Sequence, residues 1–346
     1  MELLRSIIRT RPKNVMPVPP NYEIICDANG MIITATDDVF ELLLYDRNIL
    51  LNQFIGTIMS PFMEYIHRTI LFPRYQSATP LQKNIMHVFL LGKTSKRPLI
   101  IYNVNRDPIS VEISVKPISG GNFSLKLNVV NDNNISMYLQ NSTNLSTIPS
   151  TFKQSKDKII TITLDFKNQS KYLTDYGPLK VIELHTKFRD DLIEILKRNY
   201  YPYIYIYEMT NDSCVLILNA SWTFNITRYS ASLAVCFLNE LYHTTRPYVS
   251  VRAGVTYDSL YYGTLDGHLR FFGVPFDLSS KYRNQCDENE ICVDDNFTRK
   301  LVNEKVFSKE DLNLYSRTFY IDGLQHRNSN FIDITKIDPN KILEGK

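Results

Sequence analysis

The chain has 346 residues, of which 44% are hydrophobic, 22% charged and 12% aromatic, a composition typical of globular proteins. The length predicts two domains, and the net charge of +3 is too small to indicate a nucleic-acid partner or an anionic membrane surface. No apolar run approaches the roughly 20 residues that a membrane helix needs, and residues 1–20 are interpreted as an extension without a secretory signal. Five irregularly spaced cysteines fit reduced thiols, so we expect a cytoplasmic protein.

Residues 21–130 predict one α/β unit. "YEIICDANGMIITAT" is typical of two short strands around an Asn-Gly turn, and "DDVFELLLYD" of a short helix with acidic residues at its start. "PFMEYIHRTIL" predicts a second helix. Four further runs predict strands: "IMHVFLLGK", "RPLIIYNVN", "PISVEISVKPI" and "NFSLKLNVV".

This block resembles a PAS domain over nearly its whole length, through "DANGMI" in the first hairpin, the short helices and the later strands. The resemblance implies an antiparallel-sheet sensor and dimerisation module. No PAS cofactor is identifiable, because the Asn-Cys-Arg-Phe motif of light-sensing flavin domains is absent. His67 and His87 are interpreted as structural residues rather than haem ligands. Residues 131–157 are rich in Asn, Ser and Thr and predict a polar linker.

Residues 158–335 predict a second domain, followed by a C-terminal tail at 336–346. Its elements alternate as strand, helix, hairpin, helix and strand, which is the ferredoxin-like βαββαβ arrangement of an α+β fold. In that topology the end of the first strand, at Asp165, lies beside the tip of the hairpin, at Asp212. Two neighbouring carboxylates repel unless a cation such as Mg²⁺ or Mn²⁺ lies between them, although both could also be solvated turn residues.

Five segments of this domain carry further motifs: "TLDFKNQS", "YEMTNDS", "VRAGVTYDSLYYGTL", "FFGVPFDLSSKY" and "EICVDDNFTRKL". In this order they resemble the class III adenylate and guanylate cyclase catalytic domains. The resemblance implies that Asp165 and Asp212 hold two divalent ions beneath a purine nucleoside triphosphate. It places Glu208 at the position where guanylate cyclases carry a glutamate that reads guanine, so GTP is favoured over ATP. Arg270 takes the second base-reading position, where it could donate to guanine O6 or pair with Glu208 and close the pocket.

Other positions depart from the family pattern. Asp277 and Lys281 stand where the family has the Asn and Arg that act in the transition state, and their i, i+4 spacing favours a mutual ion pair. The phosphate-binding Lys of the family falls on Asp322, and His326 and Arg327 are the alternative positions for this role. Asn168 replaces the glycine of the phosphate loop, so we expect a less open loop.

These departures predict a signalling protein with a PAS sensor and a guanylate-cyclase-like domain that binds metal-nucleotide with weak or absent cyclase activity, that is, a pseudoenzyme. A first alternative is an active guanylate cyclase that forms cyclic GMP and pyrophosphate. In the family the site forms between two domains, so this chain would act as a homodimer, or as a heterodimer with an intact cyclase-type chain. Each site would take Asp165, Asp212 and Glu208 from one chain and Asp277 and Lys281 from the other. A second alternative is a non-catalytic scaffold that acts through the PAS half.

Overall fold

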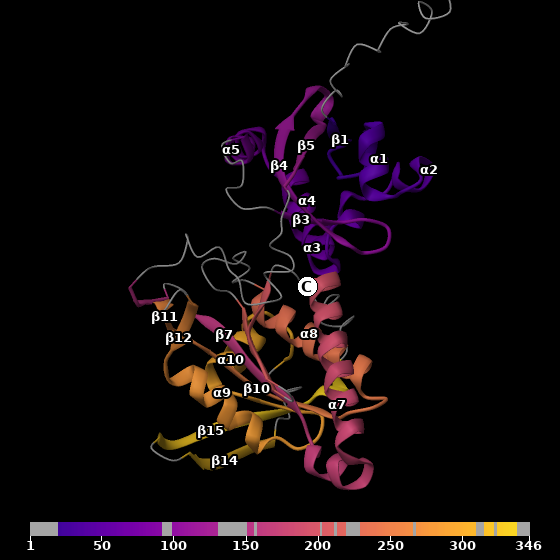
Figure 1. The fold of residues 1–346 in the computed structure, drawn as a ribbon. Helices are drawn as coiled ribbons and strands as arrows, with labels where there is room; N and C mark the ends of the chain where they lie inside the picture. The colour runs from indigo at the N-terminus through magenta and orange to yellow at the C-terminus, as the bar shows by residue number, and fades with distance from the viewer. Residues whose placement is uncertain are drawn as a thin grey trace, which may run out of the picture. The chain divides into compact units, whose positions relative to one another are not determined.

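The computed structural model describes residues 20–91, 99–130, 151–155, 158–200, 203–210, 213–218, 229–265, 268–308, 315–321 and 324–337. The chain forms two compact units (Figure 1). The first comprises Met1–Ile58, His67–Asn105 and Ile109–Val130, and the second comprises Met59–Ile66, Arg106–Pro108 and Asn131–Lys346. Among the described helices, none combines the length and the apolar character that crossing a membrane requires.

The first unit is built on a five-stranded sheet in the order β2-β1-β5-β4-β3. The pairs β1–β2, β1–β5 and β4–β5 are antiparallel. The strands are β1 (Tyr22–Cys26), β2 (Ile32–Ala35), β3 (Leu99–Tyr102), β4 (Pro108–Pro117) and β5 (Phe123–Val129). The helices between β2 and β3 in sequence are α1 (Asp37–Leu43), α2 (Arg47–Leu50), α3 (Pro61–Ile66), α4 (Phe72–Gln76) and α5 (Pro80–Leu91), of which α3 groups with the second unit.

The prediction of a strand at "IMHVFLLGK" is wrong, because most of this segment belongs to helix α5. The start of the helix explains the difference. The backbone N–H of Thr79 donates to Oε1 of Gln82 at 2.8 Å, and the backbone N–H of Gln82 donates to Oγ1 of Thr79 at 3.3 Å. This reciprocal pair is a capping box, and Pro80 at the first helical position has a backbone angle already suited to a helix. The cap sets the helix before the apolar run begins.

The second unit is built on a seven-stranded sheet in the order β14-β15-β13-β10-β7-β9-β8, with a separate three-stranded sheet β12-β11-β6. Its strands are β6 (Lys153–Gln154), β7 (Ile159–Phe166), β8 (Ile204–Met209), β9 (Ser213–Leu218), β10 (Val251–Asp258), β11 (Tyr261–Leu265), β12 (His268–Phe272), β13 (Glu290–Val293), β14 (Tyr315–Ile321) and β15 (Leu324–Asp333). Its further helices are α7 (Gln169–Ile195), α8 (Ser230–Thr245), α9 (Val274–Gln285) and α10 (Asp295–Asn303). The elements from β7 to β10 follow the strand, helix, hairpin, helix and strand order that the sequence predicts.

Part of the predicted linker is a strand. Lys153 and Gln154 form β6, which pairs with Tyr262 and Tyr261 of β11. The contact is close, because a Cβ added to Gly263 would lie 3.0 Å from Cα of Phe152. Residues 131–150 of the predicted linker lie outside the described residues.

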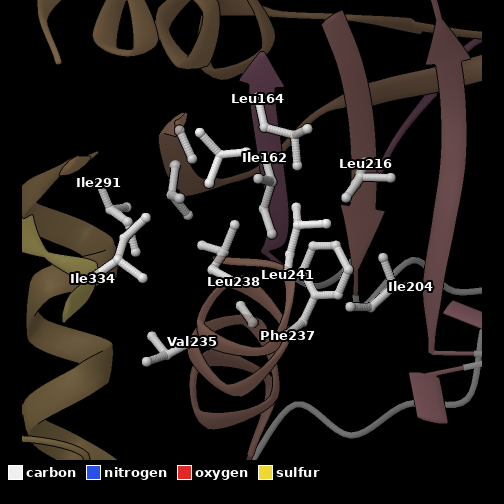
Figure 2. Close-up of a cluster of buried hydrophobic side chains, with 14 of the residues drawn as sticks. Ile162, Leu164, Ile204, Leu216, Val235, Phe237, Leu238, Leu241, Ile291 and Ile334 are labelled. Atoms are coloured by element: carbon white, nitrogen blue, oxygen red, sulfur yellow. The ribbon is translucent and has the colours of Figure 1, made fainter. Parts of the chain in front are cut away.

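One face of the large sheet carries the hydrophobic core. Alternate residues of β7, including Ile162 and Leu164, pack against α7, α8 and α10. Figure 2 shows side chains of α8, among them Phe237 and Leu241, pointing toward those of the strands. The opposite face of β7 carries Thr161, Thr163 and Asp165, all buried. Because side chains alternate along a strand, β7 therefore has one apolar face and one polar face.

Helix α9 covers the polar face, and it lies unusually close to the strands. A Cβ added to Gly254 of β10 would lie 1.9 Å from the carbonyl oxygen of Ser279 and 2.4 Å from the backbone nitrogen of Arg283. Oγ1 of Thr163 and Oγ of Ser279 form a buried hydrogen bond of 2.7 Å across the same contact. Only glycine at position 254 leaves room for the helix backbone here.

We predict that Gly254→Ala lowers the free energy of unfolding of the second unit by about 3 kcal/mol, because the added methyl group meets backbone atoms that cannot rotate away. Urea unfolding of the purified chain measures this. Gly120→Ala is the matched control, since its methyl would meet only an Asn122 side-chain atom at 3.8 Å and its positive φ costs about 1 kcal/mol. A Gly254→Ala variant within 1 kcal/mol of the wild type would show that α9 does not lie this close.

Helix α10 begins at a buried carboxylate. Asp294 is the N-cap residue, and its side chain accepts from the backbone N–H groups of Phe297 at 2.6 Å and Tyr257 at 3.1 Å. Burial raises the pKa of Asp294 from 3.8 to about 6, and the two hydrogen bonds lower it only in part. The folded protein therefore holds this proton more tightly than the unfolded chain does.

We predict that stability falls with rising pH between about 4 and 6 through this group, because its folded pKa lies above its unfolded value. Asp294→Asn keeps the shape of the cap and removes the titration. The free energy of unfolding of the variant, minus that of the wild type, should rise by about 2–3 kcal/mol from pH 4 to pH 7. A constant difference across this range, measured by urea unfolding, would contradict the raised pKa.

Candidate functional site

A bulge in β8 decides where Glu208 points. Ile206 pairs with Leu216 of β9, whereas Glu208 pairs with Val215, so Tyr207 is an extra residue in the strand. Without the bulge, residue 208 would follow Ile206 onto the hydrophobic core. With it, Glu208 lies on the polar face that α9 covers. Bulges are frequent next to binding sites, where they change the direction of a side chain.

Glu208 lines a cavity of about 270 Å³ between the sheet and α9. The described lining residues are Thr163, Glu208, Thr210, Ser213, Val215, Phe276, Asp277, Ser280 and Arg283. The volume is slightly below the range of roughly 300–1,000 Å³ typical of small-molecule sites. Most of the lining side chains carry a polar group. Such a wall suits a ligand with several hydrogen-bond donors and acceptors.

Aromatic contacts hold the wall of the cavity in place. The ring of Tyr207 packs edge-on against Phe276 of α9, with centroids 5.3 Å apart, and against Phe271 of β12 at 4.8 Å. Such pairs favour this edge-to-face geometry. The bulged strand and helix α9 are therefore fixed relative to one another next to Glu208.

Asp165 is held by two arginines. Nε of Arg252 donates to Oδ1 at 2.7 Å and Nη2 donates to Oδ2 at 3.3 Å, while Nε of Arg283 lies 3.4 Å from Oδ2. All three side chains are largely buried, with exposed fractions of 8% for Asp165, 19% for Arg252 and 15% for Arg283. The three groups together carry a net charge of +1.

These surroundings do not fit a metal ion at Asp165. Both carboxylate oxygens already contact a guanidinium group. At an effective dielectric constant of about 20, each unit charge placed about 5 Å from a guanidinium is repelled by about 3 kcal/mol. Each arginine would therefore repel a dication by about 6 kcal/mol, which offsets much of the attraction of the dication to the Asp165 carboxylate. Within the described residues, no three His, Cys, Asp or Glu side chains gather closely enough to hold a metal. The predicted Mg²⁺ or Mn²⁺ site is thus not supported by the described donors.

The second predicted metal ligand, Asp212, lies outside the described residues, as does Asp322. Ser213, which follows Asp212 in sequence, pairs with Asp165 in the β7–β9 ladder. The predicted closeness of the strand end and the hairpin tip therefore holds at the level of the backbone. His326 and Arg327 belong to β15, but their side chains are outside the described part.

The loop after β7 contains a residue with a positive φ angle. Asn168 has φ 68° and ψ 22°, in the left-handed region, directly before α7. Asparagine tolerates this region better than most residues. The expectation of a less open loop stays a prediction. The side chains face acids. The side chain of Asn168 donates to Glu288, and Nζ of Lys167 donates to Asp287 at 2.8 Å.

Asp277 and Lys281 do not form the predicted ion pair with one another. Asp277 is exposed at the cavity, and among the described residues it has no hydrogen-bond or ion-pair partner. Lys281 is not among the described residues that line the cavity. Glu208 and Asp277, which the predicted dimer takes from different chains, line one cavity within a single chain.

Arg270 lies on the side of β12 opposite to the ring of Phe271. It belongs to β12, where its neighbour Phe271 turns toward Tyr207, so Arg270 points to the opposite side of the strand. It is exposed and is not among the described residues of the cavity wall. Among the described residues Arg270 has no ion pair with Glu208, and its role in base reading stays a prediction.

Arg283 is not among the site residues that the sequence predicts. A signal for it exists in the spacing, because Ser279 and Arg283 are four residues apart and share one face of α9. That face is the one that meets Gly254 of the "VRAG" segment. The spacing alone does not place Arg283 at the site, because it does not show which face of α9 packs on β10.

Comparisons with known proteins identify fold relatives only. No family model and no curated protein matches the chain. Among solved structures, the guanylate cyclase domain of RhGC from Catenaria anguillulae in complex with GTP is 13% identical, with 52% of this chain and 97% of that chain covered and a TM-score of 0.42. The adenylyl cyclase CyaB from P. aeruginosa is 11% identical, with 52% and 94% covered and a TM-score of 0.42. The catalytic core of a rhodopsin-guanylyl cyclase in complex with ATPαS is 12% identical, with 52% and 96% covered and a TM-score of 0.42.

The chain is thus similar over about half of its length to catalytic domains of adenylyl and guanylyl cyclases. Similarity at this level says nothing of ligand or activity, which must be argued from the residues of this chain.

We predict that Asp165→Asn destabilises the metal-free protein by about 3 kcal/mol, because two largely buried guanidinium groups lose their counter-charge. Urea unfolding in the presence of EDTA measures this. Glu208→Gln, which changes an exposed carboxylate, should stay within about 0.5 kcal/mol of the wild type. A stabilised Asp165→Asn variant would instead indicate a carboxylate held among other acids, as in a metal site.

Proposed function

We propose that the second unit is a guanylate-cyclase-like module that binds a purine nucleotide, with GTP favoured over ATP, and does not cyclise it. The observation that carries this proposal is the β8 bulge, which turns Glu208 into the cavity beneath α9. The carboxylate has no described ion-pair or hydrogen-bond partner, so it is available to a ligand. It could accept from both N1–H and the exocyclic amine of guanine, whereas adenine offers no such paired donors.

The order of the motifs and the order of the strands support the same reading. The segments that resemble the cyclase family fall on β7, β8, β10, α9 and β13 with α10. The strands β10-β7-β9-β8 lie side by side in the ferredoxin-like sequence. One fold can serve many functions, so the function is assigned from the residues of the site.

Two features argue against cyclisation. Asp165 is engaged by Arg252 and Arg283 rather than free for a metal. Asp277, which has no ion-pair partner among the described residues, brings a negative charge to the position where the family has a neutral asparagine. The loss of even one charge-stabilising donor typically lowers the rate by about 10²–10³. A cyclase with this site would have negligible turnover.

The first unit is proposed as the PAS-like sensor of the same signalling protein. Its five-stranded sheet, with the helices inserted between the second and third strands of the chain, supports this reading. No bound cofactor is part of the proposal. Because Glu208 and Asp277 line one cavity in a single chain, nucleotide binding requires no second copy.

We predict that the purified protein binds GTP at least tenfold more tightly than ATP by calorimetry, and forms no cyclic product from either with Mn²⁺. Glu208→Gln should lower the GTP affinity at least tenfold, because one paired acceptor becomes a donor. Glu183→Gln on α7 is the control for an exposed glutamate and should bind as the wild type does.

Two results would refute this proposal. Cyclic GMP formation that disappears in Asp165→Asn would establish an active cyclase. The absence of binding to either nucleotide would leave the scaffold as the better reading.

A further inference from the structure

Arg283 connects the buried carboxylate to the cavity. Its Nε lies 3.4 Å from Oδ2 of Asp165, and its Nη1 donates to Oγ of Ser213 at 2.7 Å. Ser213 starts the strand that follows the hairpin tip. The guanidinium therefore spans the two backbone segments, the end of β7 and the start of β9, between which the sequence predicts a divalent cation.

The guanidinium also keeps unused donors. A guanidinium has five N–H groups. Beyond the contacts with Asp165 and Ser213, Nε and Nη2 both donate to Oδ1 of Asn284, at 3.2 and 2.9 Å. Within the described residues, the N–H of Nε, one N–H of Nη1 and one N–H of Nη2 are thereby used. One N–H group remains on Nη1 and one on Nη2. Because Arg283 lines the cavity, these two are available to an acceptor atom of a ligand.

We propose that the guanidinium of Arg283 takes the place of a divalent cation beside Asp165, so that no metal ion binds there and the cavity binds its nucleotide without one. The positive charge between β7 and β9 is then part of the chain. It neutralises Asp165 together with Arg252, and it offers N–H groups to the phosphate or carbonyl oxygens of the ligand. The nucleotide part of this inference rests on the proposed function, whereas the replacement of the cation does not.

The electrostatics favour this arrangement over a metal. Asp165, Arg252 and Arg283 already sum to +1, so a dication would enter a positive and largely buried cluster. For an oxygen of Asp165 to bind a metal, the guanidinium of Arg252 or of Arg283 would have to move away. Asp165 is the only carboxylate partner of each among the described residues. Arginine is better suited than lysine to this place, because its planar fork contacts Asp165 and Ser213 at once.

The first experiment titrates Mn²⁺ alone into the protein and follows the free Mn²⁺ signal by electron paramagnetic resonance. We expect the wild type and Asp165→Asn to give the same curve. Asp295→Asn, which removes an exposed acid of α10, controls for non-specific binding to surface carboxylates. Saturable Mn²⁺ binding that is lost in Asp165→Asn and kept in Asp295→Asn would overturn the replacement of the cation.

The second experiment measures GTP binding by calorimetry in EDTA and in excess Mg²⁺. We expect dissociation constants that agree within threefold. Arg283→Gln should weaken GTP binding at least tenfold in EDTA, and Arg283→Lys should recover part of the loss because it restores the charge. A circular dichroism melt checks that each variant is folded.

The outcomes separate the two claims. An affinity that falls tenfold or more in EDTA would overturn metal-free binding even though the proposed nucleotide ligand would stand. The absence of GTP binding in both conditions would refute the proposed function and metal-free nucleotide binding with it. The Mn²⁺ titration would still decide whether Arg283 replaces the cation.

Discussion

The close approach of α9 to the sheet at Gly254 fixes the rest of the site. Nothing larger than hydrogen fits between this residue and the backbone of Ser279 and Arg283, so the helix lies directly on β10 and β7. The hydrogen bond between Thr163 and Ser279 sets the position of the helix along the strand. Two consequences follow from this one contact. Arg283 lies beside Asp165, and Asp277 lies at the cavity that Glu208 also lines.

The polar face of β7 makes this docking specific. A sheet face that carries buried hydroxyl groups and a carboxylate is costly unless each group finds a partner. Helix α9 supplies such partners, since Oγ1 of Thr256 donates to the carbonyl of Pro275 at 2.8 Å and Thr163 bonds Ser279. Oγ1 of Thr161, which is also buried on this face, has no hydrogen-bond partner among the described residues. Moving the helix along the strand would leave further groups unpaired, so we infer that the helix position, and with it the site, is well defined.

Sequence patterns predict the parts of this structure that depend on neighbours in the chain. The alternation in "KIITITLDF" places Asp165 at the polar end of a strand, and the hairpin that follows α7 brings Ser213 beside it. Local signals can also be overlooked, as with the capping box at Thr79 that starts α5. The bulge at Tyr207 is harder to predict, because "YIYIYEM" is apolar on both faces and fits either register. The role of Arg283 could not be predicted, since it depends on how a helix docks on strands far away in sequence.

The exchange of a metal ion for a guanidinium separates binding from catalysis. A divalent ion in a nucleotide site carries two charges, keeps exchangeable ligand positions and can activate an attacking oxygen. A guanidinium carries one charge, has fixed donors and does not lose its proton at physiological pH, so it can hold an acceptor but cannot activate a nucleophile. In the proposed site, the Glu208 carboxylate and the Arg283 guanidinium between β7 and β9 supply what recognition of the nucleotide needs. The proposed site lacks the dication that the chemistry needs. Asp277, which has no ion-pair partner among the described residues, adds negative charge to the cavity where cyclisation would need developing negative charge to be stabilised.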